Sequence, residues 1–290
     1  MDKKIGNYRW TICALVFFAT TVNYLDRQVI SLLKSVLSEE MQWDDGDYAN
    51  IEIAFKLFYS FGMLIAGRVV DKLGTKLGYA VATGLWSVAA IAHALASSAF
   101  GFMMARAALG VTEAGNFPAA IKSTAEWFPK KERALATGIF NSGTNIGAIV
   151  APLSVPFIAA AWGWQWAFII TGLIGFIWLV LWQKHYTSPA DNKKLSREEY
   201  EYIHSDQEEE AVNVETEKVP WIKLISYRQT WAFAIGKFLT DPVWWFYLFW
   251  LPDFLQSQYH LTLTQIAVPV ALVYMISTIG SVGGGYLPMA

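Results

Sequence analysis

Long apolar segments recur along the chain, each at a length that suits a lipid bilayer. A helix needs about 20 mostly apolar residues to cross the hydrocarbon core of a membrane. Candidate spans of this kind lie at residues 10–33, 48–70, 77–96, 102–124, 134–157, 164–183 and 229–255, and from about 263 onward. Because backbone polar groups inside a bilayer must bond within the protein, the pattern predicts an all-α membrane protein.

Composition supports this class and excludes several others. Of the 290 residues, 54% are hydrophobic and 16% are charged, which is too apolar for an ordinary soluble domain. The formal net charge of −2 does not favour a nucleic-acid partner. The single cysteine, Cys13, excludes an intrachain disulfide framework and a multi-thiolate metal site. The sequence holds no Walker loop, HExxH helix or nucleophile elbow, so we expect neither an enzyme nor a bound cofactor or metal.

Basic residues indicate which loops face the cytoplasm. Lys and Arg concentrate before the first span and in the loops after the second and fourth spans, whereas the alternate loops hold few. The basic set is Lys3, Lys4, Arg9, Arg68, Lys72, Lys76, Lys130, Lys131 and Arg133. Since cytoplasmic loops are enriched in these residues, we expect a cytoplasmic N-terminus.

A polar stretch divides the spans into two groups. We assign 1–186 to a complete six-span bundle, 187–227 to a cytoplasmic linker and 228–290 to spans seven and eight of a second, partial bundle. In the linker, Ser196 and Glu199 have the spacing of a capping box and predict a short, charge-rich, solvated helix. The sequence stops within its eighth span, and we expect that the chain is truncated at its C-terminus.

Two opposite charges inside the fourth span indicate a functional cavity. Arg106 and Glu113 lie in ARAALGVTEAGNFP, and seven residues along a helix is about two turns, or roughly 10 Å, on one face. A charge at membrane depth is costly unless it faces the protein interior or a water-filled cavity. We therefore expect this face to border a pathway.

Other charged residues lie inside the first two spans. Asp26 and Arg27 are adjacent, which sets them about 100° apart on a helix, so each needs a partner from another helix. One arrangement pairs Arg106 with Asp26 and leaves Glu113 near the substrate. Lys56 shares a face with Tyr59, and either binds an anion or extends its ammonium to the membrane surface.

The loop after span two carries the most specific short motif. Residues 67–76 read GRVVDKLGTK, which resembles the GxxxD(R/K)xG(R/K)(R/K) signature of the major facilitator superfamily, with Thr75 at a usually basic position. Gly67 would permit close helix contact, Gly74 a tight turn, and Asp71 a bond to a helix N-terminus or to Arg133. We expect a cytoplasmic gate built from Gly67, Asp71, Lys72, Gly74 and Arg133.

A second motif falls on the span where that superfamily has one. Arg106, Gly110 and Ala114 form RxxxGxxxA, similar to its fourth-span motif. The resemblance implies two six-helix bundles around a central cavity that opens alternately to each side.

A narrower resemblance extends along the whole chain. The segments NYLDRQVIS, GVTEAGNFP, EWFPKKERA and FLTDPVWWFYLFWLP look like the anion:cation symporter family, and most like its bacterial hexuronate transporters. The resemblance implies uptake of a sugar-acid anion together with protons across the inner membrane of a bacterium. By matching position, Asp26 and Glu113 would carry protons, Arg27 and Arg106 would bind the carboxylate, and Tyr59 would contact the substrate.

Further polar and aromatic residues are candidates for binding the sugar. Asn141 and Asn145 lie one turn apart on span five, where they would bond either to hydroxyls or to neighbouring helices. Trp244 and Trp245 on span seven offer a surface for a sugar ring, and a lipid-facing aromatic stripe is the alternative.

We expect a monomeric, proton-coupled importer of hexuronate. The alternatives are a transporter of another organic anion, such as an aldonate or other monocarboxylate, and a membrane receptor that senses an anion without moving it. Counterflow separates them, because a receptor gives none.

Overall fold

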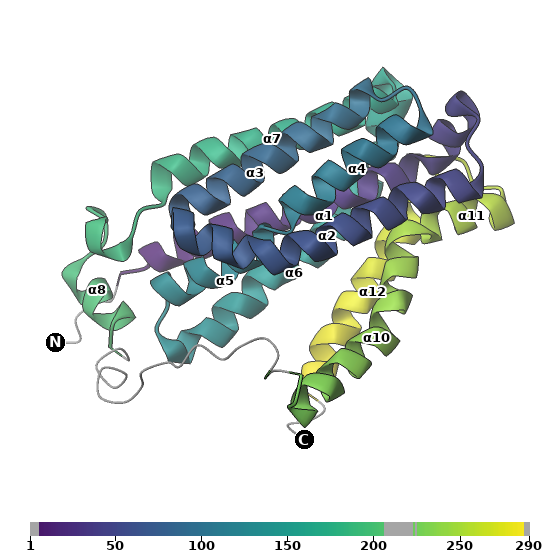
Figure 1. The fold of residues 1–290 in the computed structure, drawn as a ribbon. Coiled ribbons are helices and arrows are strands. Elements are labelled where there is room, and N and C mark those ends of the chain that lie inside the picture. Colours follow the sequence, from purple (N-terminus) through teal and green to yellow (C-terminus); the bar gives the residue numbers. More distant parts are fainter. Residues whose placement is uncertain (1–5, 206–222, 224, 287–290) are drawn as a thin grey trace.

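In the computed structural model, residues 6–205, 223 and 225–286 are described, and all their regular structure is helical. Five long helices run side by side in Figure 1: α1 (Tyr8–Met41), α2 (Asp45–Leu73), α3 (Thr75–Ala92), α6 (Lys130–Trp162) and α7 (Trp164–His185). Helices distant in sequence pack in pairs, α1 on α6, α2 on α4 and α3 on α7. The predicted all-α fold is therefore confirmed for the described residues.

Four described helices are long and apolar enough to cross a membrane: α2, α3 with its 3-10 extension (His93–Leu95), α6 and α7. α1 has 34 residues, about 51 Å of helix, and includes Asp26, Arg27 and Lys34. Its polar residues make it less apolar than the other four, and all three of these charged residues are buried.

Local chemistry fixes the turns between the first helices. Gln42 ends α1 in the left-handed conformation, and its N–H bonds to the Ser38 carbonyl. Asp44 and Asp47 then form a capping box at the start of α2. At the other end, Gly74 has a φ of 77°, which only glycine adopts without strain, so the tight turn predicted there is confirmed.

Span four is broken, although a continuous helix is predicted over 102–124. It consists of α4 (Ala99–Glu113) and α5 (Asn116–Trp127), separated by Ala114 and Gly115. Pro118 explains the break, because it has no N–H to donate to the Ala114 carbonyl and its ring crowds that oxygen. The break lies directly after Glu113.

The described part of the linker does not match the expected solvated helix. α8 (Arg197–Ile203) is capped by Ser196, which accepts from the Glu199 N–H as predicted. Glu199 itself is buried, and its carboxylate accepts from the backbone N–H groups of Tyr8 and Arg9 and from the Arg9 side chain. A buried carboxylate that caps the start of α1 attaches α8 to the bundle. The acidic run at 208–210 lies outside the described residues.

Span seven, predicted over 229–255, is also broken. α10 (Arg228–Phe249) ends at Trp250, and α11 (Leu251–Tyr259) begins with Pro252 in its first turn, where proline is favoured. α12 (Ala267–Tyr286) follows. In Figure 1, α10 and α12 run at an angle to the α1–α7 bundle, and α11 lies against the end of the bundle where α2 begins. α12 packs against α6, and its Tyr274 contacts Trp244 and the Tyr247 carbonyl of α10.

Candidate functional site

Two buried charges lie on α4. Arg106 and Glu113 are each 0% exposed, and Glu113 is the last residue of the helix. A carboxylate at a helix break inside the bundle has the setting that transporters use to bind ions and substrates at membrane depth. Both charges require partners from other helices.

Arg27 of α1 is the partner of Glu113. Arg27 Nε donates to Glu113 Oε2 at 2.6 Å, and both side chains are buried. The rings of Tyr24 and Tyr59 lie 4.7 and 4.5 Å from the Arg27 guanidinium carbon. Because aromatic faces attract cations, the two rings hold Arg27 in place.

Arg106 pairs with Glu52 of α2, so the arrangement that pairs it with Asp26 is wrong. Arg106 Nη2 donates to Glu52 Oε1 at 2.7 Å and to the Arg27 carbonyl at 3.0 Å. Glu52 is not among the residues predicted from the sequence, and it lies one turn before Lys56 on the same face of span two. A carboxylate one turn from a lysine inside an apolar span is the feature of the sequence that could have identified Glu52 as a site residue.

Asp26 is buried and has no ion-pair partner in the part of the chain that the structure describes. Neither of its carboxyl oxygens has a hydrogen-bond partner among the described residues, and the nearby Thr171 hydroxyl of α7 donates to the Phe168 carbonyl instead. An ionised carboxylate in this position would be a buried charge without a direct counterion, which is unfavourable. Among the described residues, Asp26 is thus a buried carboxyl group of the site without a direct counterion.

Phe55 lies between the two ion pairs. Its ring centroid is 5.5 Å from the Arg27 guanidinium carbon and 4.7 Å from that of Arg106. Gly110 explains why α2 comes so close, since a Cβ there would lie 2.5 Å from the Phe55 carbonyl oxygen and 3.0 Å from the Tyr59 nitrogen. Gly110 of the RxxxGxxxA motif thus allows the α2 segment with Glu52, Phe55 and Tyr59 to pack directly on α4.

Aromatic residues of α10 face the same region. Phe249 is buried, with its ring centroid 4.9 Å from Lys56 Nζ and 5.7 Å from the Arg106 guanidinium carbon. Trp245 stacks on Phe249 and lies 5.6 Å from Lys56 Nζ. Trp244 instead contacts Tyr274 of α12. Of the two predicted tryptophans, Trp245 is thus the one that lies beside the charged residues of α2.

The predicted asparagines lie apart from the ion pairs. Asn141 is exposed and Asn145 half-buried on α6, and among the described residues no hydrogen bond joins either side chain to Arg27, Glu113 or Arg106. Gly143, between them, packs α6 against the Phe17 carbonyl of α1.

Contacts between α1 and α11 connect the first bundle (α1–α7) to the second unit, which consists of α10, α11 and α12. They lie at the end of the bundle whose loops hold few basic residues. Lys34, 3% exposed, donates to Asp45 of α2 and to Asp253 of α11, both at 2.6 Å. Ser35 donates to Gln256 at 2.6 Å. We call the Lys34–Asp253 and Ser35–Gln256 bonds the α1–α11 contact. Tyr48 adds a bond to the Phe249 carbonyl at 2.8 Å.

At the opposite, basic end, the gate motif is arranged differently from the prediction. Asp71 pairs with Lys122 of α5 at 2.8 Å rather than with Arg133. Arg133 donates to the carbonyls of Phe128 and Ala125, which closes the end of α5. Lys72 is exposed. A Cβ on Gly67 would meet no atom within 4 Å, so the close helix contact expected there is absent.

Thr75, the departure from the motif, has a polar partner of its own. Its hydroxyl donates to Glu126 at 2.5 Å, and the Tyr186 hydroxyl donates to the same carboxylate. Burial, together with the nearby Glu126 charge, raises the pKa of the Tyr186 phenol. The phenol therefore stays protonated and donates throughout the physiological pH range.

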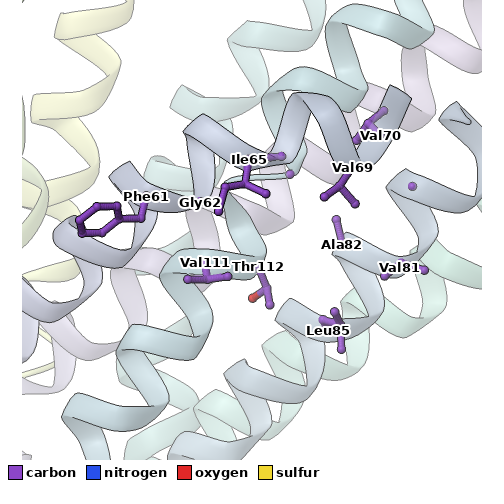
Figure 2. A pocket seen from close by; sticks show the side chains of 13 residues that line it. Phe61, Gly62, Ile65, Val69, Val70, Val81, Ala82, Leu85, Val111 and Thr112 are labelled. Atoms are coloured by element: carbon purple, nitrogen blue, oxygen red, sulfur yellow. The ribbon is translucent and has the colours of Figure 1, made fainter. Parts of the chain in front are cut away.

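An apolar groove of about 260 Å³ lies between α2, α3 and α4, and Figure 2 shows its lining side chains. Phe61, Ile65, Val69, Val81, Leu85 and Val111 line it. The one hydroxyl, on Thr112, bonds back to the Ala108 carbonyl. A groove without a charged or free polar group does not suit a hydrophilic anion, so the candidate site is the pair of buried ion pairs.

Comparison with known families gives a match over nearly the whole chain. The model described as Major Facilitator Superfamily matches residues 16–288.

Similar proteins include transporters of sugar acids. The galacturonate transporter of Dickeya chrysanthemi is 37% identical over 286 residues, which cover 99% of this chain and 83% of that protein. The hexuronate transporter of Escherichia coli strain K12 is 38% identical over 286 residues, covering 99% of this chain and 66% of that protein. A D-galactonate transporter of Escherichia coli O6:H1 is 28% identical, covering 98% and 68%.

Two solved structures share the fold. A bacterial homologue of the human lysosomal transporter Spinster, in an inward-facing and unoccupied conformation, gives a TM-score of 0.78 at 17% identity, covering 98% of this chain and 63% of that one. A D-xylose-proton symporter gives 0.65 at 16% identity, covering 98% and 70%.

Proposed function

The chain belongs to the major facilitator superfamily, and we propose that it imports a hexuronate or a closely related sugar acid together with protons. The observation that carries the proposal is the buried Arg27–Glu113 pair next to Asp26, which has no ion-pair partner among the described residues. The resemblance to galacturonate and hexuronate transporters supports the substrate class.

Competition for Arg27 couples protons to substrate. A guanidinium binds a carboxylate through two parallel hydrogen bonds, and Glu113 occupies it at 2.6 Å when no substrate is bound. Protonation of Glu113 weakens that pair and frees Arg27 for the carboxylate of the sugar acid. Asp26, buried without a counterion, holds a second proton.

Aromatic and basic groups around Arg27 orient the sugar. Tyr59 lies against the Arg27 guanidinium, and its hydroxyl is a donor for a sugar oxygen. Trp245 offers a ring face and Lys56 a second positive charge at 5.6 Å from that ring. Asn141 and Asn145 would approach the substrate only from α6.

Alternating access requires that the two bundles separate first at one end and then at the other. The charge distribution of the loops assigns the α1–α11 contact to the outside and the Asp71–Lys122 pair to the cytoplasm. We infer that the α1–α11 contact closes the outer side over Phe249. The chain acts as a monomer, with its N-terminus in the cytoplasm.

Transport by the purified chain in proteoliposomes tests the proposal. We expect an inward proton gradient to drive accumulation of radiolabelled glucuronate or galacturonate, and a protonophore to abolish it. Glu113→Gln should lose gradient-driven accumulation but keep counterflow, because exchange does not need net proton movement. Uptake that ignores the proton gradient would disprove coupling, and the absence of counterflow in the unmodified chain would disprove transport.

Similarity to a transporter of another sugar acid supports one alternative substrate. The D-galactonate transporter is 28% identical along 98% of this chain, so an aldonate is the second candidate substrate. Competition of unlabelled galactonate against labelled galacturonate decides between them.

A further inference from the structure

The proposed function leaves one buried ion pair without a role, Glu52 with Arg106. We propose that Glu52 is a positioning residue that keeps Arg106 neutralised, and that it thereby sets the external pH at which the proton-carrying carboxylates load. The inference rests on the proposed proton coupling and adds a residue on α2 to it.

Geometry makes Arg106 unsuitable as a direct substrate ligand in this state. It is 0% exposed, its Nη2 is shared between Glu52 Oε1 and the Arg27 carbonyl, and its Nε also faces Glu52 at 3.3 Å. Phe55 covers one side of the guanidinium at 4.7 Å and Phe249 lies 5.7 Å away. Arg106 therefore ties α2 to the backbone of α1 at Arg27, one residue from Asp26.

The charge balance of the site depends on Glu52. The titratable and charged groups around the pair are Asp26 and Arg27 on α1, Tyr48 and Lys56 on α2, His93 after α3, Glu113 on α4 and Asp253 on α11. Arg27 has Glu113 as its counterion, and Lys56 is half-buried against aromatic rings. Glu52 is thus the one carboxylate in direct contact with Arg106 among the described residues.

Removing the Glu52 charge leaves Arg106 as an uncompensated buried cation. The carboxylates within its electrostatic range are then Asp26 and Glu113. A nearby cation favours the ionised form of a carboxylate, so both would bind protons less readily. Uptake would then require a more acidic outside solution.

Three variants test this by the sign of their effects on the pH profile of gradient-driven uptake. We expect Glu52→Gln to lower the half-maximal pH by about one unit, a tenfold change in proton concentration. Arg106→Gln should raise it, because Glu52 is then an uncompensated anion. The double variant should return near the profile of the unmodified chain, since it removes both charges together.

A purely structural role predicts something else. It would lower uptake at every pH in both single variants without moving the midpoint, and Glu52→Asp would not rescue the profile. Either an unshifted midpoint in Glu52→Gln or shifts of the same sign in both single variants would overturn the proposal. So would complete loss of counterflow in Arg106→Gln, which would make Arg106 a substrate ligand.

Failure of the proposed function is distinguishable from failure of this inference. The first appears in the unmodified chain, as uptake that does not respond to a proton gradient. The second appears only in the variants, while the unmodified chain remains proton-driven. If Glu52→Gln does not fold, Arg106→Gln and the double variant keep the test decisive, because the midpoint should rise in the single variant and return to that of the unmodified chain in the double variant.

Discussion

Arg27 differs from an ordinary cation in a membrane protein because three side chains fix its plane. Glu113 accepts at 2.6 Å, while Tyr24 and Tyr59 lie within 4.7 Å of the guanidinium carbon. Lysine keeps the charge but has neither the planar fork nor the stacking surface. We expect Arg27→Lys to raise the KM for the sugar acid at least about tenfold, the worth of one lost charge-assisted hydrogen bond.

Substrate-dependent counterflow measures this KM. The control is Arg197→Lys, since Arg197 is 88% exposed and pairs with Glu201 on the surface of α8. That variant should behave like the unmodified chain, because exposed pairs contribute little. An unchanged KM in Arg27→Lys would show that a point charge is sufficient and that the fork has no role.

For individual residues, the sequence indicates which charged side chains are buried but not which of them form ion pairs. Asp26, Arg27, Arg106 and Glu113 are recognisable because a charge inside an apolar span must face the protein interior. Their partners depend on which helices are neighbours, and that is a property of the tertiary structure. Glu52 was missed for this reason.

The close packing of α2 against α4 requires Gly110, which has no side chain. A Cβ on Gly110 would lie 2.5 Å from the Phe55 carbonyl oxygen, which belongs to the α2 backbone and cannot rotate away. Gly110→Ala therefore forces the helices apart and displaces Glu52 and Tyr59. We expect a loss of about 1–3 kcal/mol in stability, typical of overpacking, together with reduced counterflow.

Thermal unfolding in detergent measures the stability, with Gly138→Ala as the matched control. Gly138 also lies in a helix, and a Cβ there would meet no atom within 4 Å. Alanine should be neutral or slightly stabilising at that position, since it favours the helix. Equal melting temperatures for the two variants would contradict the role given to Gly110.

Helix number and order follow from apolar length, whereas helix breaks depend on single residues within those lengths. Pro118 and Pro252 are both visible in the sequence, yet an 18- to 20-residue apolar window averages over them. Each proline removes one backbone donor and ends the helix before it. The Glu199 carboxylate at the start of α1 is different, because the sequence holds no sign that two segments 190 residues apart will meet.

In the whole molecule, one side of α1 faces the second unit. Gln28, Ser31 and Ser35 follow helical i, i+3 and i+7 spacing, and Gln28 donates to Tyr274 of α12 while Ser35 donates to Gln256. Ser31, between them, is 0% exposed. If the bundles separate at the α1–α11 contact during transport, this stripe must become accessible from outside.

Lys34 binds two aspartates, and substituting each one distinguishes an effect on closure of the bundles from an effect on local stability. Asp253 lies on α11 in the second unit, whereas Asp45 lies on α2 within the same bundle as Lys34. Asp253→Asn removes the negative charge from a bond that exists only while the two units are in contact. The weaker neutral bond should shift the population toward the outward-open state. Asp45→Asn removes the negative charge from a bond of equal length, 2.6 Å, that does not cross between the units.

Labelling of Ser31→Cys by a membrane-impermeant maleimide reads out that population, in a background where Cys13 is replaced by alanine. We expect Asp253→Asn to increase the labelling rate several-fold over the parent, and Asp45→Asn to leave it nearly unchanged. A population ratio responds exponentially to a lost interaction, with a factor of ten for each 1.4 kcal/mol, so even a partly exposed pair gives a measurable change. Equal labelling rates in the two variants would show that the α1–α11 contact does not control opening of the outer side.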